Sequence, residues 1–167
     1  MAGLPGSGKS AVAEDLGRAL PAAVLSVDPV EAAMWRAGVK RHEPTGLAAY
    51  LVVEAIADEL LGLGQAVVVD AVNAVEAARE QWRALARRHD LIVRFIEVIC
   101  PDRDLHRRRL HQRHRGIEGF PEPTWMSVEA RRAEFAGWTD DRLVLDSTRP
   151  RQENLAAALD HLAAPPR

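Results

Sequence analysis

The first ten residues contain the most specific pattern of the chain, a glycine-rich loop of the kind that binds phosphate. Gly3 and Gly8 bracket four residues, and Lys9 and Ser10 follow directly, which is the G-x-x-x-x-G-K-[ST] pattern. Glycine permits backbone torsions that other residues avoid, so consecutive N–H groups can surround phosphate oxygens where a helix begins. We therefore predict that ATP or GTP is bound by Gly3, Pro5, Gly6, Ser7, Gly8, Lys9, Ser10 and Ala11.

Two side chains are candidates for holding Mg²⁺ beside the phosphates. The Ser10 hydroxyl is the loop ligand that the pattern provides, while Lys9 places a positive charge near the β- and γ-phosphates. Asp70 ends the most apolar run of the chain, AVVVD, and an acid at that position organises Mg²⁺ opposite the loop hydroxyl. Asp70 could also be an ordinary acid at a strand end. Asn73 has Glu76 three residues later and is expected to cap a helix, with contact to the ligand as the alternative.

Asp28 follows another apolar run and has two possible roles. A carboxylate beside the γ-phosphate could accept the proton of an attacking hydroxyl group. The same residue is followed by Pro29 and, three positions on, by Glu31, the pattern of a helix N-cap with proline in the first turn. The two roles are compatible, and the residues alone leave both open.

The segment from Asp102 to Arg115 is a predicted helix with six arginines. Arg109 and Arg113 are four residues apart and therefore share a helix face. Their guanidinium groups could stabilise charge on a transferring phosphoryl group, so both are predicted catalytic residues. A solvated basic face and a site for a polyanion such as a nucleic acid are the alternatives. Three other arginines, Arg103, Arg108 and Arg115, are expected mainly at the surface. The histidines of this segment are expected to be exposed to solvent: His106, His111 and His114.

Composition limits the class of protein. The chain has 167 residues, 47% of them hydrophobic, a net charge of -2 and a single cysteine. These values fit one domain spanning 1–167, without a disulfide, in a reducing cytoplasm. The slightly acidic balance disfavours a nucleic-acid coat protein or one bound to an anionic membrane. No apolar run approaches the length of a transmembrane helix.

Short apolar runs alternate with helical periodicity, which favours an α/β fold with a mainly parallel sheet. We predict strands over 22–27, 66–70, 91–100 and 142–146. We predict helices over 8–20, 29–37, 46–63, 75–89, 102–115, 124–137 and 150–162. The Gly- and Pro-rich segment 116–123 is expected to be the tip of a mobile lid covering about 103–125.

The beginning of the chain departs from the usual order. A strand normally leads into a phosphate-binding loop, but only Met1 and Ala2 precede Gly3. We expect the first, central strand to be missing or truncated, either because the start omits it or because another segment fills its place. Its loss should weaken the sheet and the anchoring of the loop.

The segments GLPGSGKS, VDAVN, HRRRLHQR, PEPTW and LVLDST resemble the AAA_33-type P-loop kinases, a group similar to polynucleotide kinase, zeta toxin and gluconate kinases. This resemblance implies a three-layer α/β/α fold like that of nucleoside monophosphate kinases, with ATP and Mg²⁺ and phosphoryl transfer to a hydroxyl group. Lys9 and Ser10 match the loop, Asp28 the acid that activates the hydroxyl and Asp70 the strand-end acid. Arg109 and Arg113 fall in the lid region.

The leading hypothesis is a kinase, monomeric or homodimeric, that phosphorylates a small molecule or a nucleoside held between Asp28, Trp35 and the lid. One alternative is a nucleic-acid 5′-hydroxyl kinase, in which case oligonucleotides would be the acceptors. Another is a non-catalytic nucleotide-binding module, or an NTPase whose only acceptor is water.

Overall fold

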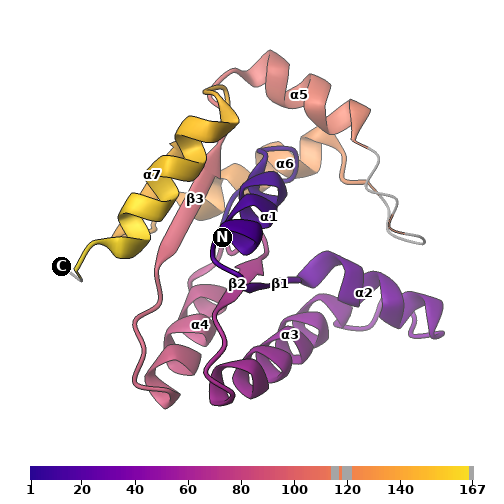
Figure 1. Ribbon diagram of the computed structural model, residues 1–167. Coiled ribbons are helices and arrows are strands. Elements are labelled where there is room, and N and C mark those ends of the chain that lie inside the picture. Colours follow the sequence, from indigo (N-terminus) through magenta and orange to yellow (C-terminus); the bar gives the residue numbers. More distant parts are fainter. Residues whose placement is uncertain (114–116, 118–121, 166–167) are drawn as a thin grey trace.

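The computed structural model describes residues 1–113, 117 and 122–165. One or more helices separate each strand from the next along the chain (Figure 1). Among the described residues, no helix combines the length and apolar character needed to cross a bilayer. The strands are β1 (Ala23–Ser26), β2 (Val67–Asp70), β3 (Phe95–Ile99) and β4 (Arg142–Asp146). The helices are α1 (Lys9–Ala19), α2 (Val27–Arg36), α3 (Thr45–Gly62), α4 (Glu76–Arg88), α5 (Arg103–Gln112), α6 (Trp125–Arg132) and α7 (Arg151–Ala163), with a short 3₁₀ helix η1 (Ala133–Phe135) after α6.

The strands form two parallel pairs, β1 with β2 and β3 with β4. Met1 and Ala2 lie between the pairs, in the central place of the sheet. The Met1 amine donates to the Val69 carbonyl at 2.7 Å. The Ala2 amide donates to the Ile96 carbonyl at 2.8 Å, and its own carbonyl accepts from the Val98 amide at 2.9 Å. Ala2 makes a single parallel bridge, with Glu97, so the segment before the loop joins the sheet without forming a full strand.

Helices cover both faces of the sheet, which is the predicted three-layer α/β/α arrangement. Successive side chains of β2 point to opposite faces. Val67 and Val69 pack with α3 and α4, through Val53 and Trp82 among others. Val68 packs on the other face, in the cluster that α1 and α7 form with the inner side of β3. A continuous apolar run such as AVVVD is the signature of a strand covered on both faces.

Several predicted boundaries shift in the structure. Helix α2 begins at Val27, directly after β1, so its N-cap is Ser26. The prediction that Asp28 is the N-cap is therefore wrong, and Asp28 lies inside the first turn, where its negative charge is favoured by the helix dipole. Strand β3 omits 91–94 from the predicted run. The predicted helix over 124–137 is divided into α6 and η1.

The short central segment buries an ionisable group. The Met1 amine lies inside the sheet, and burial is the main cause that lowers its pKa from 8.0 to about 6. Between these two values the amine is neutral in the folded chain but carries a proton in the unfolded chain. The unfolded state therefore binds more protons over this range, and stability must rise with pH.

We predict that the free energy of unfolding of the chain that retains Met1 increases by about 2 kcal/mol between pH 6 and pH 8. The measurement is urea denaturation at several pH values. The same chain acetylated at Met1 is the control, because its amide keeps the N–H donor but does not titrate. Parallel pH profiles for the two forms would contradict the assignment.

Candidate functional site

The phosphate loop runs from the Ala2 bridge into α1, and close packing explains its glycines. Gly3 has φ +142°, and a Cβ atom there would lie 2.5 Å from the Val98 carbonyl oxygen. Gly8 has φ +100° and is the N-cap of α1, where a Cβ atom would lie 3.1 Å from Ser147 Cβ. Larger residues at either position would strain the backbone as well as clash. The first backbone amides of α1 therefore lie directly after the loop. The N-terminus of a helix favours the binding of an anion.

A cavity of about 550 Å³ opens in front of this loop; we call it the nucleotide pocket. Of the predicted phosphate-binding residues, Gly6, Gly8, Lys9, Ser10 and Ala11 line it. The other three form the frame of the loop. Gly3 contacts β3, Ser7 is buried at 1% exposure, and Pro5 lines the neighbouring cavity.

Lys9 and Asp70 meet at the floor of the nucleotide pocket. Lys9 Nζ lies 3.9 Å from Asp70 Oδ1, and both side chains are nearly completely buried. The β1–β2 register places Ser26 beside Asp70, and the Ser26 hydroxyl donates to Asp70 Oδ2 at 3.4 Å. Two buried opposite charges attract each other more strongly than they would in water, because little water screens them. The strand end therefore presents a fixed carboxylate to the loop lysine.

The donors in this pocket fit Mg²⁺ that arrives with a nucleotide. Ser10 and Asp70 both line it, and hydroxyl and carboxylate oxygens are the hard donors that Mg²⁺ prefers. Within the part of the chain that the structure describes, no group of three or more His, Cys, Asp or Glu residues could hold a metal by itself. Phosphate oxygens and water would therefore supply most of the ligands, as is usual for this ion.

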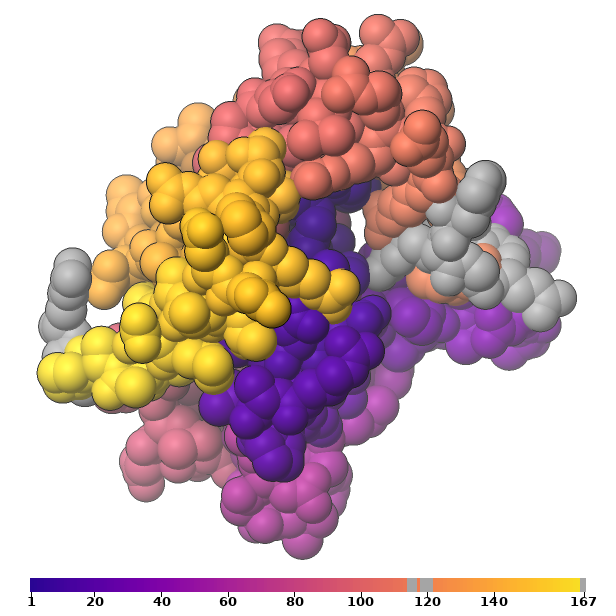
Figure 2. All heavy atoms as spheres, turned by 45° about the horizontal axis from the view of Figure 1, so that its top comes forward, coloured from indigo at the N-terminus to yellow at the C-terminus, as the bar shows by residue number. Residues whose placement is uncertain are grey.

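Arg109 of α5 and Arg113, the C-cap residue of that helix, line the same pocket; the helix ends at Gln112, three residues before the predicted end. Arg109 is fixed by the loop after β4, where its guanidinium donates to Ser147 Oγ at 2.8 Å and to the Ser147 carbonyl at 3.1 Å. The Arg113 side chain is 14% exposed, and burial lowers its pKa from the ordinary value. Figure 2 shows α5 above the N-terminal segment that carries the loop.

The other arginines of this helix face outward. Arg103 is exposed and pairs with Glu129 of α6, and Arg107 and Arg108 are exposed as well. Arg115, His114 and most of the predicted lid tip lie outside the described residues.

A second cavity of about 640 Å³ adjoins the nucleotide pocket; we call it the second pocket. Asp28 lines the second pocket, and Arg113 lines both cavities. The Arg113 guanidinium lies 3.8 Å from Asp28 Oδ2 and 3.8 Å from Glu122 Oε2. Arg113 therefore places a positive charge where the two cavities meet. It lies next to Asp28, whose carboxylate is the predicted catalytic base.

Trp35 is placed differently from the prediction, because it does not line the second pocket. Its indole donates to Thr45 Oγ1 at 3.0 Å, and the Thr45 hydroxyl donates to Glu31 Oε1 at 2.8 Å. Glu31 does line the cavity. Trp35 therefore supports the wall of the second pocket indirectly, through Thr45 and Glu31.

Asn73 is neither a helix cap nor a residue lining either of these two cavities. It is 1% exposed with φ +52°, and the N-cap of α4 is Val75. Its amide side chain donates to the Met1 carbonyl at 2.7 Å and accepts from Trp82 Nε1 at 2.8 Å. Asn73 instead ties the entry of the phosphate loop to α4.

The burial of His106 is the most important difference from the prediction. This residue was expected at the surface, but it is 1% exposed. Its Nε2 lies 2.8 Å from the Pro5 carbonyl, and its ring meets Trp125 edge-on at 5.3 Å between centroids. Burial is the main cause that lowers the pKa of His106, so the ring is neutral near pH 7. A carbonyl only accepts, and therefore Nε2 must carry the proton.

A signal for this burial was present in the sequence. His106 and Leu110 are four residues apart on a helix otherwise rich in arginine, and Leu110 is also buried. Leu110 packs with Leu4 and Val128. The pair forms the inner face of α5, which fastens this helix to the phosphate loop.

The fold and the phosphate loop define a P-loop protein of the α/β/α class. Residues 1–135 match the family described as AAA domain. The chain belongs to this AAA domain family, as the resemblance in its motifs indicated.

Solved structures show the same fold. An unliganded sugar kinase from Janibacter sp. HTCC2649 has a TM-score of 0.70 at 16% identity, over 96% of this chain and 91% of that one. The APS kinase CysC of Mycobacterium tuberculosis, in complex with AMPPNP and APS, gives 0.67 at 21%, over 98% and 95%. Chaetomium thermophilum Kti12 in complex with ADP-AlF3 gives 0.69 at 17%, over 98% and 97%. At these identities the similarity establishes the fold alone. No curated protein sequence matches the chain significantly.

We predict that His106→Leu weakens ATP binding about fivefold, the effect of losing one neutral hydrogen bond of about 1 kcal/mol, because the loop loses its contact at Pro5. His106→Gln should bind ATP nearly as the parent does, since its amide nitrogen can occupy the place of Nε2. Calorimetric titration with ATP is the measurement. Equal ATP affinities for the two variants would show that this hydrogen bond does not position the loop.

Proposed function

We propose that this protein is a kinase that transfers the γ-phosphoryl group of ATP to a hydroxyl group of a small molecule or a nucleoside. The observation that carries the proposal is the pair of adjoining cavities with Arg113 at their junction. One contains the phosphate loop and the other contains Asp28. A phosphoryl donor and a hydroxyl acceptor need this arrangement, because the γ-phosphate and the attacking oxygen must meet in line.

On the donor side, the loop amides and Lys9 hold the β- and γ-phosphates. Ser10 and Asp70 would hold Mg²⁺, which neutralises charge on the phosphate oxygens. Lys9 is already aligned by Asp70 at 3.9 Å, so it needs no large rearrangement to meet a phosphate. GTP can make the same contacts with the loop, since these involve only the phosphates.

On the acceptor side, Asp28 receives the proton of the hydroxyl group that attacks. The position of Asp28 in the first turn of α2 fixes its backbone, and the side chain faces the cavity beside Arg113. The guanidinium also places a positive charge beside this carboxylate. The other polar residues of the cavity could orient the remainder of the acceptor: Glu31, Tyr50, Gln81, Glu122, Arg131 and Glu134.

Arg113 and Arg109 act on the charge that develops during transfer. Arg113 is held by two carboxylates at 3.8 Å, contacts too long for ideal hydrogen bonds. Its guanidinium can therefore turn toward a phosphoryl group without first losing short hydrogen bonds to these carboxylates. Arg109 is anchored through Ser147, so it supports the pocket from a fixed place.

The proposal is tested by screening hydroxyl compounds for stimulated ADP release, with the parent chain and Asp28→Asn. We expect the variant to bind ATP normally but to lose acceptor-dependent turnover by a factor of about 100 or more, the usual contribution of a general base. Asp104→Asn, at an exposed acid of α5, is the matched control. Unchanged turnover in Asp28→Asn would remove this residue from the mechanism.

The same screen separates the other functions. Oligonucleotide-dependent ADP release with steep salt dependence would identify a nucleic-acid kinase. ATP binding without any stimulated release would leave a nucleotide-binding module or an NTPase acting on water.

We further predict that Arg113→Lys lowers kcat by about 100-fold or more while the dissociation constant of ATP changes little, because a lysine cannot provide the planar fork that spans the transferring group. Arg107→Lys, at an exposed position of the same helix, should leave both quantities unchanged. Steady-state kinetics with the identified acceptor and calorimetry with ATP provide the two values. A change in ATP affinity alone would place Arg113 in nucleotide binding only.

A further inference from the structure

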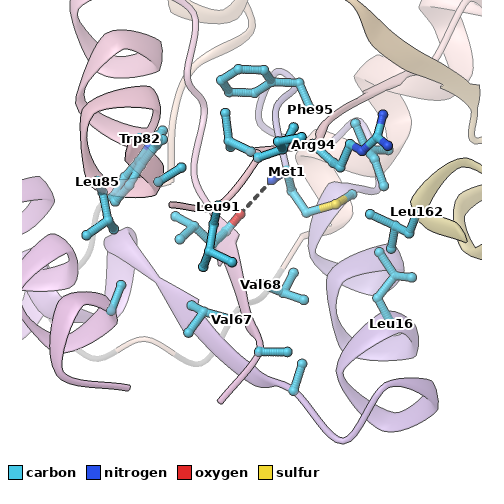
Figure 3. Close-up of a pocket in the computed structure, with 18 of the residues that line it drawn as sticks. Met1, Leu16, Val67, Val68, Trp82, Leu85, Leu91, Arg94, Phe95 and Leu162 are labelled. Atoms are coloured by element: carbon cyan, nitrogen blue, oxygen red, sulfur yellow. Dashed lines mark hydrogen bonds between the residues drawn. The ribbon is translucent and has the colours of Figure 1, made fainter. Parts of the chain in front are cut away.

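Two cavities near the N-terminal segment differ in the chemistry of their walls. An apolar groove of about 300 Å³ lies beside Met1, and Leu16, Trp82 and Leu162 form part of its walls (Figure 3). The second pocket, of about 640 Å³, is lined by charged and polar side chains as well, and its volume is typical of sites for small organic ligands. A hydroxyl compound needs hydrogen-bond partners when it leaves water. The polar groups of the second pocket therefore decide which acceptors fit.

Glu31 is held in the wall of the second pocket, one helical turn after Asp28. Both residues belong to α2, and residues three positions apart share a face of a helix. The Thr45 hydroxyl donates to Glu31 Oε1 at 2.8 Å, and Thr45 is itself buried and accepts from the Trp35 indole. The second carboxylate oxygen of Glu31 has no hydrogen-bond donor among the described residues. Glu31 is thus a fixed acceptor with one oxygen left for a ligand.

Gln81 and Tyr50 add one acceptor and one donor to this wall. The Gln81 amide nitrogen donates to the Tyr50 carbonyl at 3.1 Å and to Glu54 Oε2 at 2.7 Å. Both of its hydrogens are used, so the amide oxygen of Gln81 is the group left for a ligand. The Tyr50 hydroxyl accepts from the Asn73 amide at 3.2 Å, which leaves its hydrogen to donate to a ligand.

Carboxylates outnumber guanidinium groups among the described residues that line the second pocket. They are Asp28, Glu31, Glu122 and Glu134 on one side and Arg113 and Arg131 on the other. In the proposed function Arg113 turns toward the phosphoryl group. A bound nucleotide therefore draws one of these two cations away from the acceptor, and the second pocket becomes more negative.

Arg79, behind the same wall, does not reverse this balance. Its guanidinium donates to the Asn73 carbonyl at 3.1 Å and pairs with Glu76 at 3.0 Å and with Asp140 at 3.6 Å. Its charge is compensated by these two carboxylates.

We propose that the acceptor is a hydroxyl compound that carries a protonated amino group, such as an amino sugar or an amino alcohol, and that Glu31 binds this amino group. The inference rests on the proposed function, because it names the class of acceptor that the second pocket takes. An ammonium group supplies three hydrogen-bond donors and a positive charge, which match the excess of acceptors and of negative charge. A carboxylate or phosphate group on the acceptor would meet like charges, which disfavours binding.

The charge of the amino group also determines which atom is phosphorylated. The protonated nitrogen has no lone pair, so the hydroxyl oxygen is the nucleophile. A bond forms between this oxygen and the γ-phosphorus, and the bond from the γ-phosphorus to the β–γ bridging oxygen breaks. The proton of the hydroxyl group goes to Asp28. The products are ADP and a phosphate monoester that keeps its amino group.

The test measures binding by calorimetry, with AMPPNP and Mg²⁺ present, for probes that differ in charge on the same carbon skeleton. One set is glucosamine, glucose and glucuronate, and the other is 3-amino-1,2-propanediol, glycerol and glycerate. In at least one set, we expect the amine to bind about tenfold or more tightly than the neutral compound, the effect of a hydrogen bond between charged groups. The carboxylates should bind most weakly.

Glu31→Gln provides the matching variant, because glutamine keeps an acceptor for the Thr45 hydroxyl but removes the negative charge. It should weaken binding of the amine about tenfold or more and leave the affinities for the neutral compound and for AMPPNP unchanged. Glu59→Gln, at an exposed acid of α3, is the control and should change none of these affinities.

The proposal would be overturned if neither amine bound, or if the neutral compound or the carboxylate bound as tightly as the amine. An unchanged amine affinity in Glu31→Gln, with AMPPNP bound normally, would overturn it as well. ADP release from ATP is measured with the same probes, so that the two proposals fail separately. Amine binding without stimulated release would contradict the kinase but support the preference of the pocket. Release stimulated only by neutral or anionic probes would support the kinase and contradict the amine.

Discussion

The phosphate loop depends on being fixed at both ends, because backbone amides select an anion only when they are already aligned. At its entry, Ala2 makes two hydrogen bonds to β3 and Met1 makes one to β2. At its exit, Gly8 begins α1. Between these points the His106 ring holds the Pro5 carbonyl. The geometry of the whole site follows from these few contacts, since Lys9 and Ser10 are attached directly to the loop.

Helix α5 links this constraint to the rest of the site. One of its faces packs on the loop through His106 and Leu110. Arg109, from the same helix, and Arg113, at its C-cap, both line the nucleotide pocket. The same helix thus connects the phosphate loop with the two guanidinium groups that are expected to act on the phosphates.

Patterns within short stretches predicted much of the fold. The loop motif, the strand AVVVD and the order of helices and strands each arise from neighbouring residues, and the structure has them with ends shifted by a few positions. The three-layer arrangement follows from alternating apolar runs and helices. A predicted helix boundary was wrong where two local patterns competed. Asp28 fits a cap, but the chain enters the helix at Val27 because β1 ends directly before it.

The sequence by itself determined the phosphate loop, the acid at the end of β2 and the helix that carries Arg109, because each depends on spacing along one element or motif. Only the tertiary structure decided that His106 is buried against Pro5, that Asn73 braces Met1 and Trp82, and that Arg113 stands between two cavities. It also showed the open groove beside Met1. These features depend on contacts between elements far apart in the chain, and side-chain type and local spacing do not specify which of those elements meet.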